Sequence, residues 1–124
     1  LFYQDQDNKI ILKVNQQLKF TPGLGFPSLV DVASKLKISE RTLKRELANS
    51  NTTYSSLLQS KKFELAKKLI DSNRNIQEIS DLLGYSHISA FSRAFFGWTG
   101  KKPSEYIREQ RISIKNYYLK KSKY

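Results

Sequence analysis

Residues Ile76-Gln-Glu-Ile-Ser-Asp-Leu-Leu-Gly-Tyr-Ser-His-Ile-Ser-Ala-Phe-Ser-Arg93 decide the fold of this chain. Up to Leu83, the apolar residues recur at the spacing of three and four that is typical of an amphipathic helix. Gly84 follows where a helix ends in a left-handed residue, a conformation that glycine adopts at little cost. Ser86 then offers a side-chain oxygen to the unpaired amides at the start of a second helix. The stretch therefore predicts two short helices joined by a tight turn.

The second of these helices is expected to cover about residues 87–96 and to turn an aromatic face inward. Phe91, Phe95 and Phe96 form that inner face. The outer positions carry small polar and basic side chains, namely Ser89, Ser92 and Arg93. A helix, a glycine turn and a capped helix with a polar outer face form the layout of a helix-turn-helix motif. Such a motif places its second helix in the major groove of DNA.

A second copy of this pattern lies earlier in the chain, at residues 29–47. It aligns with the later copy at a shift of 47 residues before the turn and 48 after it. The matched pairs retain their chemistry: Val32 with Ile79, Leu36 with Leu83, Ile38 with Tyr85, Ser39 with Ser86, Leu43 with Phe91, Arg45 with Arg93, and Leu47 with Phe95. The weakest match is Lys37, which falls on Gly84 and costs about 1 kcal/mol if its backbone is left-handed. Two copies are too few for a solenoid, so the repeat predicts a tandem pair of DNA-reading helices.

Charge is the strongest signal in the composition. The 124 residues include 22 Lys and Arg against 11 Asp and Glu, which gives a net charge of +11. Such an excess favours a polyanionic partner, usually nucleic acid and less often an anionic membrane surface. A highly charged but otherwise inert surface is the alternative interpretation. The length suits one compact domain, or two very small ones that share a helix.

Several protein classes are disfavoured by what the sequence lacks. It has no cysteine, which excludes disulfides and thiolate metal sites and suits a reducing cytoplasm. No apolar run approaches the ~20 residues of a membrane span, and no signal peptide is visible. Methionine is also absent, even at position 1, where Leu1 stands. We therefore expect a cytoplasmic piece of a longer protein, or a trimmed chain, so that any ligand-sensing or dimerising domain would lie upstream.

No strand pattern of period two is sustained, so we expect an all-α fold with seven helices. The expected helices cover about residues 8–18, 28–36, 39–48, 54–71, 76–83, 87–96 and 103–110. Ser28 and Ser39 are expected to cap the second and third helices, with Asp31 close to a capping box in the second. Pro103 suits the first position of the last helix. Tyr106 and Ile107 are expected to pack this helix against the core.

The chain divides into five expected segments. They are a linker at 1–8, a first helix-turn-helix subdomain at 9–53, a connecting helix at 54–71, a second subdomain at 72–111, and a basic tail at 112–124. The tail either extends the last helix or stays loose. A turn is expected at 97–100, with Trp98 covering the core. The connecting helix, about 27 Å long, is expected to set the separation of the two reading helices, near the ~34 Å of one DNA turn.

Residues 84–106, Gly-Tyr-Ser-His-Ile-Ser-Ala-Phe-Ser-Arg-Ala-Phe-Phe-Gly-Trp-Thr-Gly-Lys-Lys-Pro-Ser-Glu-Tyr, resemble the C-terminal signature of the AraC/XylS family of bacterial transcription regulators. Residues 76–83 belong to the same signature. Residues 36–45 resemble that family's first recognition segment, and residues 66–69 resemble its connecting helix. The resemblance covers about residues 10–108, and the ordered Gly, Phe-Ser-Arg-Ala-Phe, Gly and Pro-Ser-Glu-Tyr elements make it specific.

The resemblance implies a monomeric domain with two helix-turn-helix units in a homeodomain-like tandem, which binds double-stranded DNA sequence-specifically. It also implies an N-terminal effector-binding or dimerisation domain outside this sequence, and RNA polymerase is a further candidate partner. The sequence departs from the family at Lys37, where many members carry a small residue. It departs again beyond Arg111, so the role of the tail stays open.

Residue chemistry and the resemblance select nearly the same DNA-binding side chains. In the first unit they are Arg41, Thr42, Lys44 and Arg45, and in the second they are Ser86, His87, Ile88, Ser89, Ser92 and Arg93. Arg and Lys suit guanine O6 and N7, Ser and Thr bond either bases or phosphates, and Ile meets a thymine methyl. The candidate phosphate contacts are Ser39, Lys101 and Lys102.

Each of these assignments has an alternative. Arg45 and Arg93 can instead form structural salt bridges or contact phosphates. His87 would be a metal ligand only with partners at ligand spacing, and none accompanies it. The aromatic residues of the second unit could stack on single-stranded bases, but their helical spacing favours core packing. The lysines at 61, 62, 67 and 68 are interpreted as a solvated face, with one or two candidates for phosphate contact.

The second hypothesis is of another class. A basic helical module could dock an acidic protein partner, and weak DNA binding that ignores sequence would favour it. No catalytic triad, paired-carboxylate motif, metal cluster or phosphate-binding glycine loop is present. We therefore expect no enzymatic activity, no cofactor and no metal.

Overall fold

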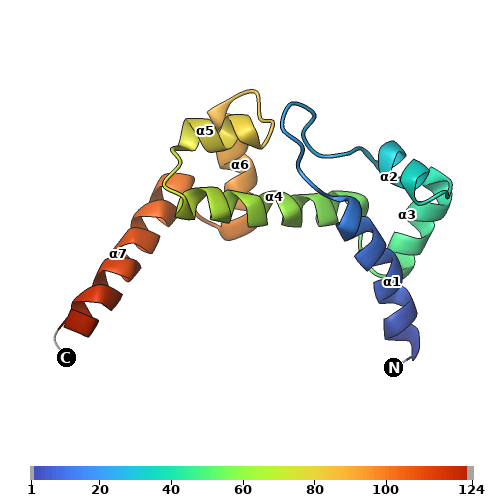
Figure 1. Cartoon of the computed structure of the whole chain (residues 1–124), viewed down its shortest axis with the longest axis horizontal. Helices are drawn as coiled ribbons and strands as arrows, with labels where there is room; N and C mark the ends of the chain where they lie inside the picture. The colour runs from blue at the N-terminus through green and yellow to red at the C-terminus, as the bar shows by residue number, and fades with distance from the viewer. Residues whose placement is uncertain (1, 123–124) are drawn as a thin grey trace. The chain divides into compact units, whose positions relative to one another are not determined.

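The computed structural model describes residues 2–122, with side chains for residues 9–121. It contains seven helices: α1 (Phe2–Gln17), α2 (Leu29–Lys35), α3 (Glu40–Asn49), α4 (Tyr54–Asp71), α5 (Ile76–Leu82), α6 (Ile88–Thr99) and α7 (Pro103–Ser122) (Figure 1). The described part has no strand, only an isolated bridge between Thr21 and Gly25. The all-α prediction is therefore confirmed. The chain forms two compact units, Leu1–Glu64 and Leu65–Tyr124, which divide within α4.

Unit 1 has an aliphatic core in which α1 and α2 both pack against α3. The buried residues are Ile10, Val14 and Leu18 from α1 and the residue after it, Val32 and Ala33 from α2, and Leu43 and Leu47 from α3. Tyr54 at the start of α4 donates a hydrogen bond to the Pro27 carbonyl, which ties the beginning of α4 to the entry of α2. Burial raises the pKa of the Tyr54 phenol, and the Asp31 charge adds to the effect.

Unit 2 has an aromatic core built on α6, which contacts both α5 and α7. Phe91 and Phe95 are fully buried, with ring centroids 5.7 Å apart. Trp98 packs edge-on against both rings, so its predicted position over the core is confirmed. The ring centroids of Tyr106 and Phe95 are 5.2 Å apart, so Tyr106 packs α7 against α6, also as predicted. Aromatic pairs at these distances prefer such tilted and edge-on geometry.

The turns after α2 and α5 are the same hydrogen-bonded structure. After α2, the Lys37 amide donates to the Ser34 carbonyl and the Ile38 amide to the Ala33 carbonyl. After α5, Gly84 donates to Asp81 and Tyr85 to Ser80. Both are Schellman motifs, and each requires a left-handed residue, here Lys37 at φ 60° and Gly84 at φ 86°. The same motif closes α3 at Asn51 and α4 at Asn73.

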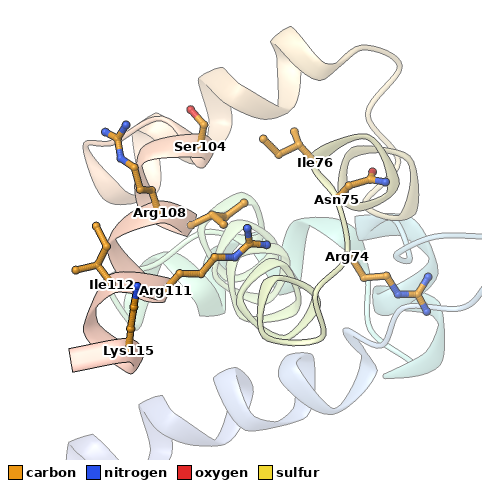
Figure 2. A pocket seen from close by; sticks show the side chains of 9 residues that line it. Arg74, Asn75, Ile76, Ser104, Arg108, Arg111, Ile112 and Lys115 are labelled. Atoms are coloured by element: carbon orange, nitrogen blue, oxygen red, sulfur yellow. The ribbon is translucent and has the colours of Figure 1, made fainter. Parts of the chain in front are cut away.

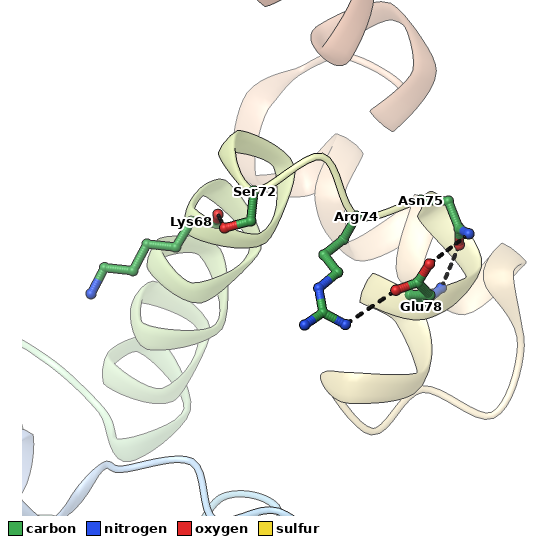
Figure 3. A network of polar contacts seen from close by, with 5 residues as sticks. All are labelled: Lys68, Ser72, Arg74, Asn75 and Glu78. Atoms are coloured by element: carbon green, nitrogen blue, oxygen red, sulfur yellow. Dashed lines mark hydrogen bonds and ion pairs between the residues drawn. The ribbon is translucent and has the colours of Figure 1, made fainter.

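The start of each helix-turn-helix motif is capped by a side chain. Ser28 and Asp31 form the expected capping box at α2, and the bonds from Ser28 hold the pKa of Asp31 below its usual value. Asn75 caps α5 by accepting from the Glu78 amide, while its own amide donates to the Glu78 carboxylate (Figure 3). Ser39 caps α3 as predicted.

The first helix is longer than expected, because α1 begins at Phe2 rather than near Asn8. The expected linker at 1–8 is therefore helical from Phe2, while Leu1 lies outside the described residues. These residues include no Gly or Pro, and extending an existing helix costs far less than nucleating one.

The start of α6 was predicted wrongly by one residue. Its N-cap is His87, which makes no capping bond from its side chain, and Ser86 lies one residue before it. The shift of 48 residues that holds after the turn already places His87 opposite Ser39. Ser86 is therefore the one residue by which the second motif is longer than the first.

The end of α6 was also predicted wrongly. The helix continues through Gly97 to Thr99 and ends at Gly100, which has φ 74°. The expected turn at 97–100 is absent because Trp98 packs on the core one helical turn beyond Phe95. Phe96 was expected to point inward but is 56% exposed, since it lies about 100° around the helix from Phe95.

The last helix takes in most of the expected tail. Helix α7 runs without interruption from Pro103, its predicted first residue, to Ser122. The structure thereby decides that the tail continues the helix up to Ser122, and residues 123–124 lie outside the described part. Every side chain from Arg111 to Lys121 is exposed.

We predict that Lys37→Gly stabilises unit 1 by about 0.5–1 kcal/mol. A left-handed backbone strains an L-residue by more than glycine loses in unfolded-state entropy. Urea unfolding followed by circular dichroism checks this change. The matched control is Gly84→Ala, where a Cβ would meet no atom within 4 Å, so a loss of about 1 kcal/mol would come from the backbone alone. A loss of stability in Lys37→Gly would show that its side chain matters more than its backbone.

We also predict that Ser80→Ala stabilises unit 2 by about 1 kcal/mol. The Ser80 hydroxyl is fully buried and has no hydrogen-bond partner among the described residues, and such a group costs about 1–3 kcal/mol. The repeat places Ala33 at the same position of unit 1. Unfolding is followed by the fluorescence of Trp98, the single tryptophan. Ala33→Ser is the reciprocal control and should destabilise, whereas a loss in Ser80→Ala would mean that the hydroxyl is paired.

Candidate nucleic-acid interface

Helix α3 turns a basic surface away from the core of unit 1. Leu43 and Leu47 are its buried side, while Arg41, Lys44 and Arg45 are exposed. None of the three cations forms a salt bridge within the described residues. The predicted base-reading cations of the first unit therefore lie together on one helix and are available to a partner.

Two predicted contacts of the first unit, Ser39 and Thr42, hydrogen-bond to each other. The Ser39 hydroxyl accepts from the Thr42 amide at 3.0 Å and donates to the Thr42 hydroxyl at 2.9 Å. Thr42 keeps its own hydroxyl proton, which can still be donated to a base or phosphate. Their structural role is to begin α3 at Glu40, and so to place Arg41 in its first turn.

The outer surface of α6 is less charged than that of α3. Ser86 and His87 are exposed just before the helix, and Ser89 and Arg93 are exposed on it. Ile88 is 38% exposed, and Ser92 is half-buried. The structure thus brings all six predicted residues of the second unit to the beginning and outer side of one helix.

Equivalent grooves border the two outer surfaces. The groove in unit 1 is lined by Leu29, Lys44, Ala48, Tyr54 and Ser55, among others. The groove in unit 2, here called the α6 groove, includes their counterparts Ile76, Ser92, Phe96, Pro103 and Ser104. The numbering difference between corresponding residues is 47 in the first helix, 48 in the second and 49 in the third. The repeat therefore covers three helices, α2–α4 in the first copy and α5–α7 in the second. The second copy is one residue longer in each of the two connections between its helices.

Phe96 is the residue of this surface that the sequence analysis missed. It lines the α6 groove with Ile88 and Arg93. The available signal was its angle around the helix, because Phe96 lies about 100° from the inward-facing Phe95. An exposed aromatic ring beside Arg93 and Ile88 offers an apolar surface suited to a thymine methyl or a deoxyribose.

The predicted phosphate contacts beyond α6 differ in availability. Lys101 forms an ion pair with Glu109 of α7, so its charge is already balanced by a carboxylate. Lys102 is exposed and lines the α6 groove beside Arg93. On α4, Lys61 pairs with Glu64, and burial lowers the pKa of Lys62. Lys67 and Lys68 are exposed, as a solvated face would be.

Other chemistries receive no support from the described residues. They contain no group of three His, Cys, Asp or Glu side chains that could hold a metal ion. None of the described helices is both long and apolar enough to cross a membrane. Arg, Lys, Ser and Thr on an exposed helix are instead the donors that read base edges and hold phosphates.

The comparison with known proteins agrees with this geometry. A family model described as a helix-turn-helix domain matches residues 32–109. The ornithine utilization regulator of Pseudomonas aeruginosa is 37% identical over 103 residues, which are 82% of this chain and 30% of that protein. The porin thermoregulatory protein EnvY of Escherichia coli is 37% identical over 84 residues, or 67% of this chain and 33% of that protein. This chain thus spans about a third or less of the curated relatives that it matches.

Solved structures show the same fold. A DNA-binding transcriptional dual regulator from Escherichia coli K-12 matches with a TM-score of 0.69 and 25% identity, over 86% of this chain and 93% of that one. The transcriptional regulator CdpR from Pseudomonas aeruginosa matches with a TM-score of 0.65 and 33% identity, over 86% of this chain and 31% of that one. The chain therefore belongs to the AraC/XylS-type helix-turn-helix family of DNA-binding transcription regulators.

Proposed function

We propose that α3 and α6 act as two recognition helices, which enter successive major-groove segments of one DNA duplex and read its sequence. The observation that carries this proposal is the equivalence of the two motifs. Each has the same Schellman turn and an exposed arginine at the same position of its second helix, Arg45 or Arg93. Two equivalent recognition helices in one chain are suited to binding two segments of one DNA site.

The side chains suggest different tasks for the two helices. Arg41, Lys44 and Arg45 give α3 three donors for guanine O6 and N7. On α6, Arg93 is the cation, Ser89 and Ser92 donate to bases or phosphates, and Ile88 meets a thymine methyl. We therefore propose that the half of the site bound by α3 is the richer in guanine.

Phosphate contacts supply a large part of the affinity in this proposal. The chain carries a net charge of +11, and Lys102 borders the α6 groove. The amides at the starts of α3 and α6 add partial positive charge next to Ser39, Ser86 and His87. Binding should therefore weaken steeply as salt is raised.

The full-length protein belongs to the same proposal. Because this chain spans about a third or less of its curated relatives, we propose an N-terminal effector-binding or dimerisation domain upstream. A regulator that acts on a bacterial chromosome works in the cytoplasm, and RNA polymerase is the partner through which it would alter transcription. Docking of an acidic protein by this chain alone is the competing function, and the measurements below separate the two.

We predict that Arg41→Ala and Arg93→Ala each weaken specific binding by about 1–3 kcal/mol and relax the base preference at one position. A bidentate arginine discriminates its guanine from other bases, so its removal should matter most on the preferred sequence. The measurement is fluorescence-anisotropy titration of each variant with a selected duplex and its single-base substitutions.

Lys13→Ala is the matched control, because Lys13 is an exposed cation on α1, which belongs to neither helix-turn-helix motif. It should leave the base preference unchanged. If Arg41→Ala and Arg93→Ala weaken binding equally on every sequence, the two residues hold phosphate only. If the unchanged chain shows no preference among duplexes, the acidic-partner function gains over DNA reading.

A further inference from the structure

Helix α7 carries a row of cations that the two recognition motifs do not use. Arg108, Arg111 and Lys115 are spaced by three and four residues, which places them within about 60° of the helix circumference. All three are exposed, and none forms a salt bridge within the described part of the chain. These three charges are therefore available to an anionic partner.

These cations line an open groove of about 530 Å³ between α7 and the start of α5, here called the α7 groove (Figure 2). Arg74 and Asn75 lie on its opposite side, and Arg74 is paired with Glu78 (Figure 3). Ile76, Ile107 and Ile112 provide apolar surface on which the alkyl parts of long cationic side chains can lie. The α7 groove therefore combines unpaired positive charges with an apolar surface against which their side chains can pack.

The α7 groove is continuous with the recognition surface. Ile76 and Ser104 line both this groove and the α6 groove, where Arg93 and Lys102 lie. In helix-turn-helix proteins, the first helix of the motif crosses the DNA backbone while the second enters the groove. The start of α5, which is the first helix here, forms one side of the α7 groove. The row on α7 thus lines a groove that adjoins the one bordering the recognition helix.

The internal repeat shows that two of these three cations, Arg108 and Lys115, have no cationic counterpart in the first motif. At the shift of 49 residues, Arg108, Arg111 and Lys115 correspond to Gln59, Lys62 and Ala66 of α4. Ala66 is fully buried, and burial lowers the pKa of Lys62. The same helical positions thus serve packing in α4 and present charge to solvent in α7.

We propose that the α7 row, Arg108, Arg111 and Lys115, binds the phosphates that flank the part of the site read by α6. This inference rests on the proposed function and adds a contact to it. Three cations on one face are opposite in charge to the phosphates of a DNA strand. The site bound by this chain then reaches beyond the base pairs that α3 and α6 read, on the α6 side only.

The test compares Arg111→Gln/Lys115→Gln with the unchanged chain on two selected duplexes. One duplex ends at the last base pair read by α6, and the other continues for about one further helical turn. On the extended duplex we expect the double variant to bind about tenfold more weakly, with a salt slope reduced by about two. On the short duplex the two proteins should bind alike, and the base preference should be the same.

Lys120→Gln/Lys121→Gln is the matched control, since it removes the same charge from the same helix. These lysines lie about 120–140° around α7 from Lys115. The control should bind the extended duplex within twofold of the unchanged chain.

An equal loss of affinity in both double variants, or an equal loss on both duplexes, would overturn the α7 contact and leave only a general effect of charge. A preserved base preference in either case keeps the proposed function intact, while its absence in the unchanged chain would refute that function separately.

Discussion

Two crossed backbone hydrogen bonds at the end of α2 and of α5 hold each helix-turn-helix motif together. They require a left-handed residue, which is Gly84 in the second motif and Lys37 in the first. The turn brings Ile38 or Tyr85 back over the core, and the next helix begins two or three residues later. The direction of α3 and α6, and so the side of each helix that faces a partner, follows from this turn. A strained lysine is tolerated there because the buried residues on both sides of the turn, such as Ala33 and Leu43, hold the geometry.

The repeat explains why one fold serves two surfaces with different chemistry. Most buried positions are apolar in both copies, with Leu43 and Leu47 of unit 1 replaced by Phe91 and Phe95 in unit 2, while many exposed positions differ. Where α3 presents three cations, α6 presents serines, an isoleucine and one arginine. The third helix of each repeat diverges furthest. The later part of α4 packs in unit 2 through Ala66 and Ile70, whereas the corresponding part of α7 is exposed and basic. The same helical frame thus gives packing in one copy and a candidate phosphate contact in the other.

Most of the fold follows from local chemistry that a sequence displays. Helical spacing located the buried pairs Leu43 with Leu47 and Phe91 with Phe95, and side-chain caps located the starts of α2 and α3. The errors lie where local signals compete. Ser86 looks like a cap, but one extra residue in the turn moves that position to His87. Gly97 looks like a helix end, but the packing of Trp98 carries the helix past it. The extension of α7 beyond Arg111 could not be predicted from apolar spacing. Every side chain from Arg111 to Lys121 is exposed, so no buried face imposes a helical pattern on the sequence there.

For the site, spacing identified the cations of α3 and α6. It did not identify Phe96, whose exposure depends on its angle around α6.

Hydroxyl-radical footprinting of this chain on a selected duplex tests the central claim most directly, because it maps contacts on each strand without mutation. Two recognition helices in successive major-groove segments should protect two tracts on one face of the duplex, about one helical turn apart. Protection of a single tract would contradict the account, since only one of the two equivalent motifs would then engage DNA.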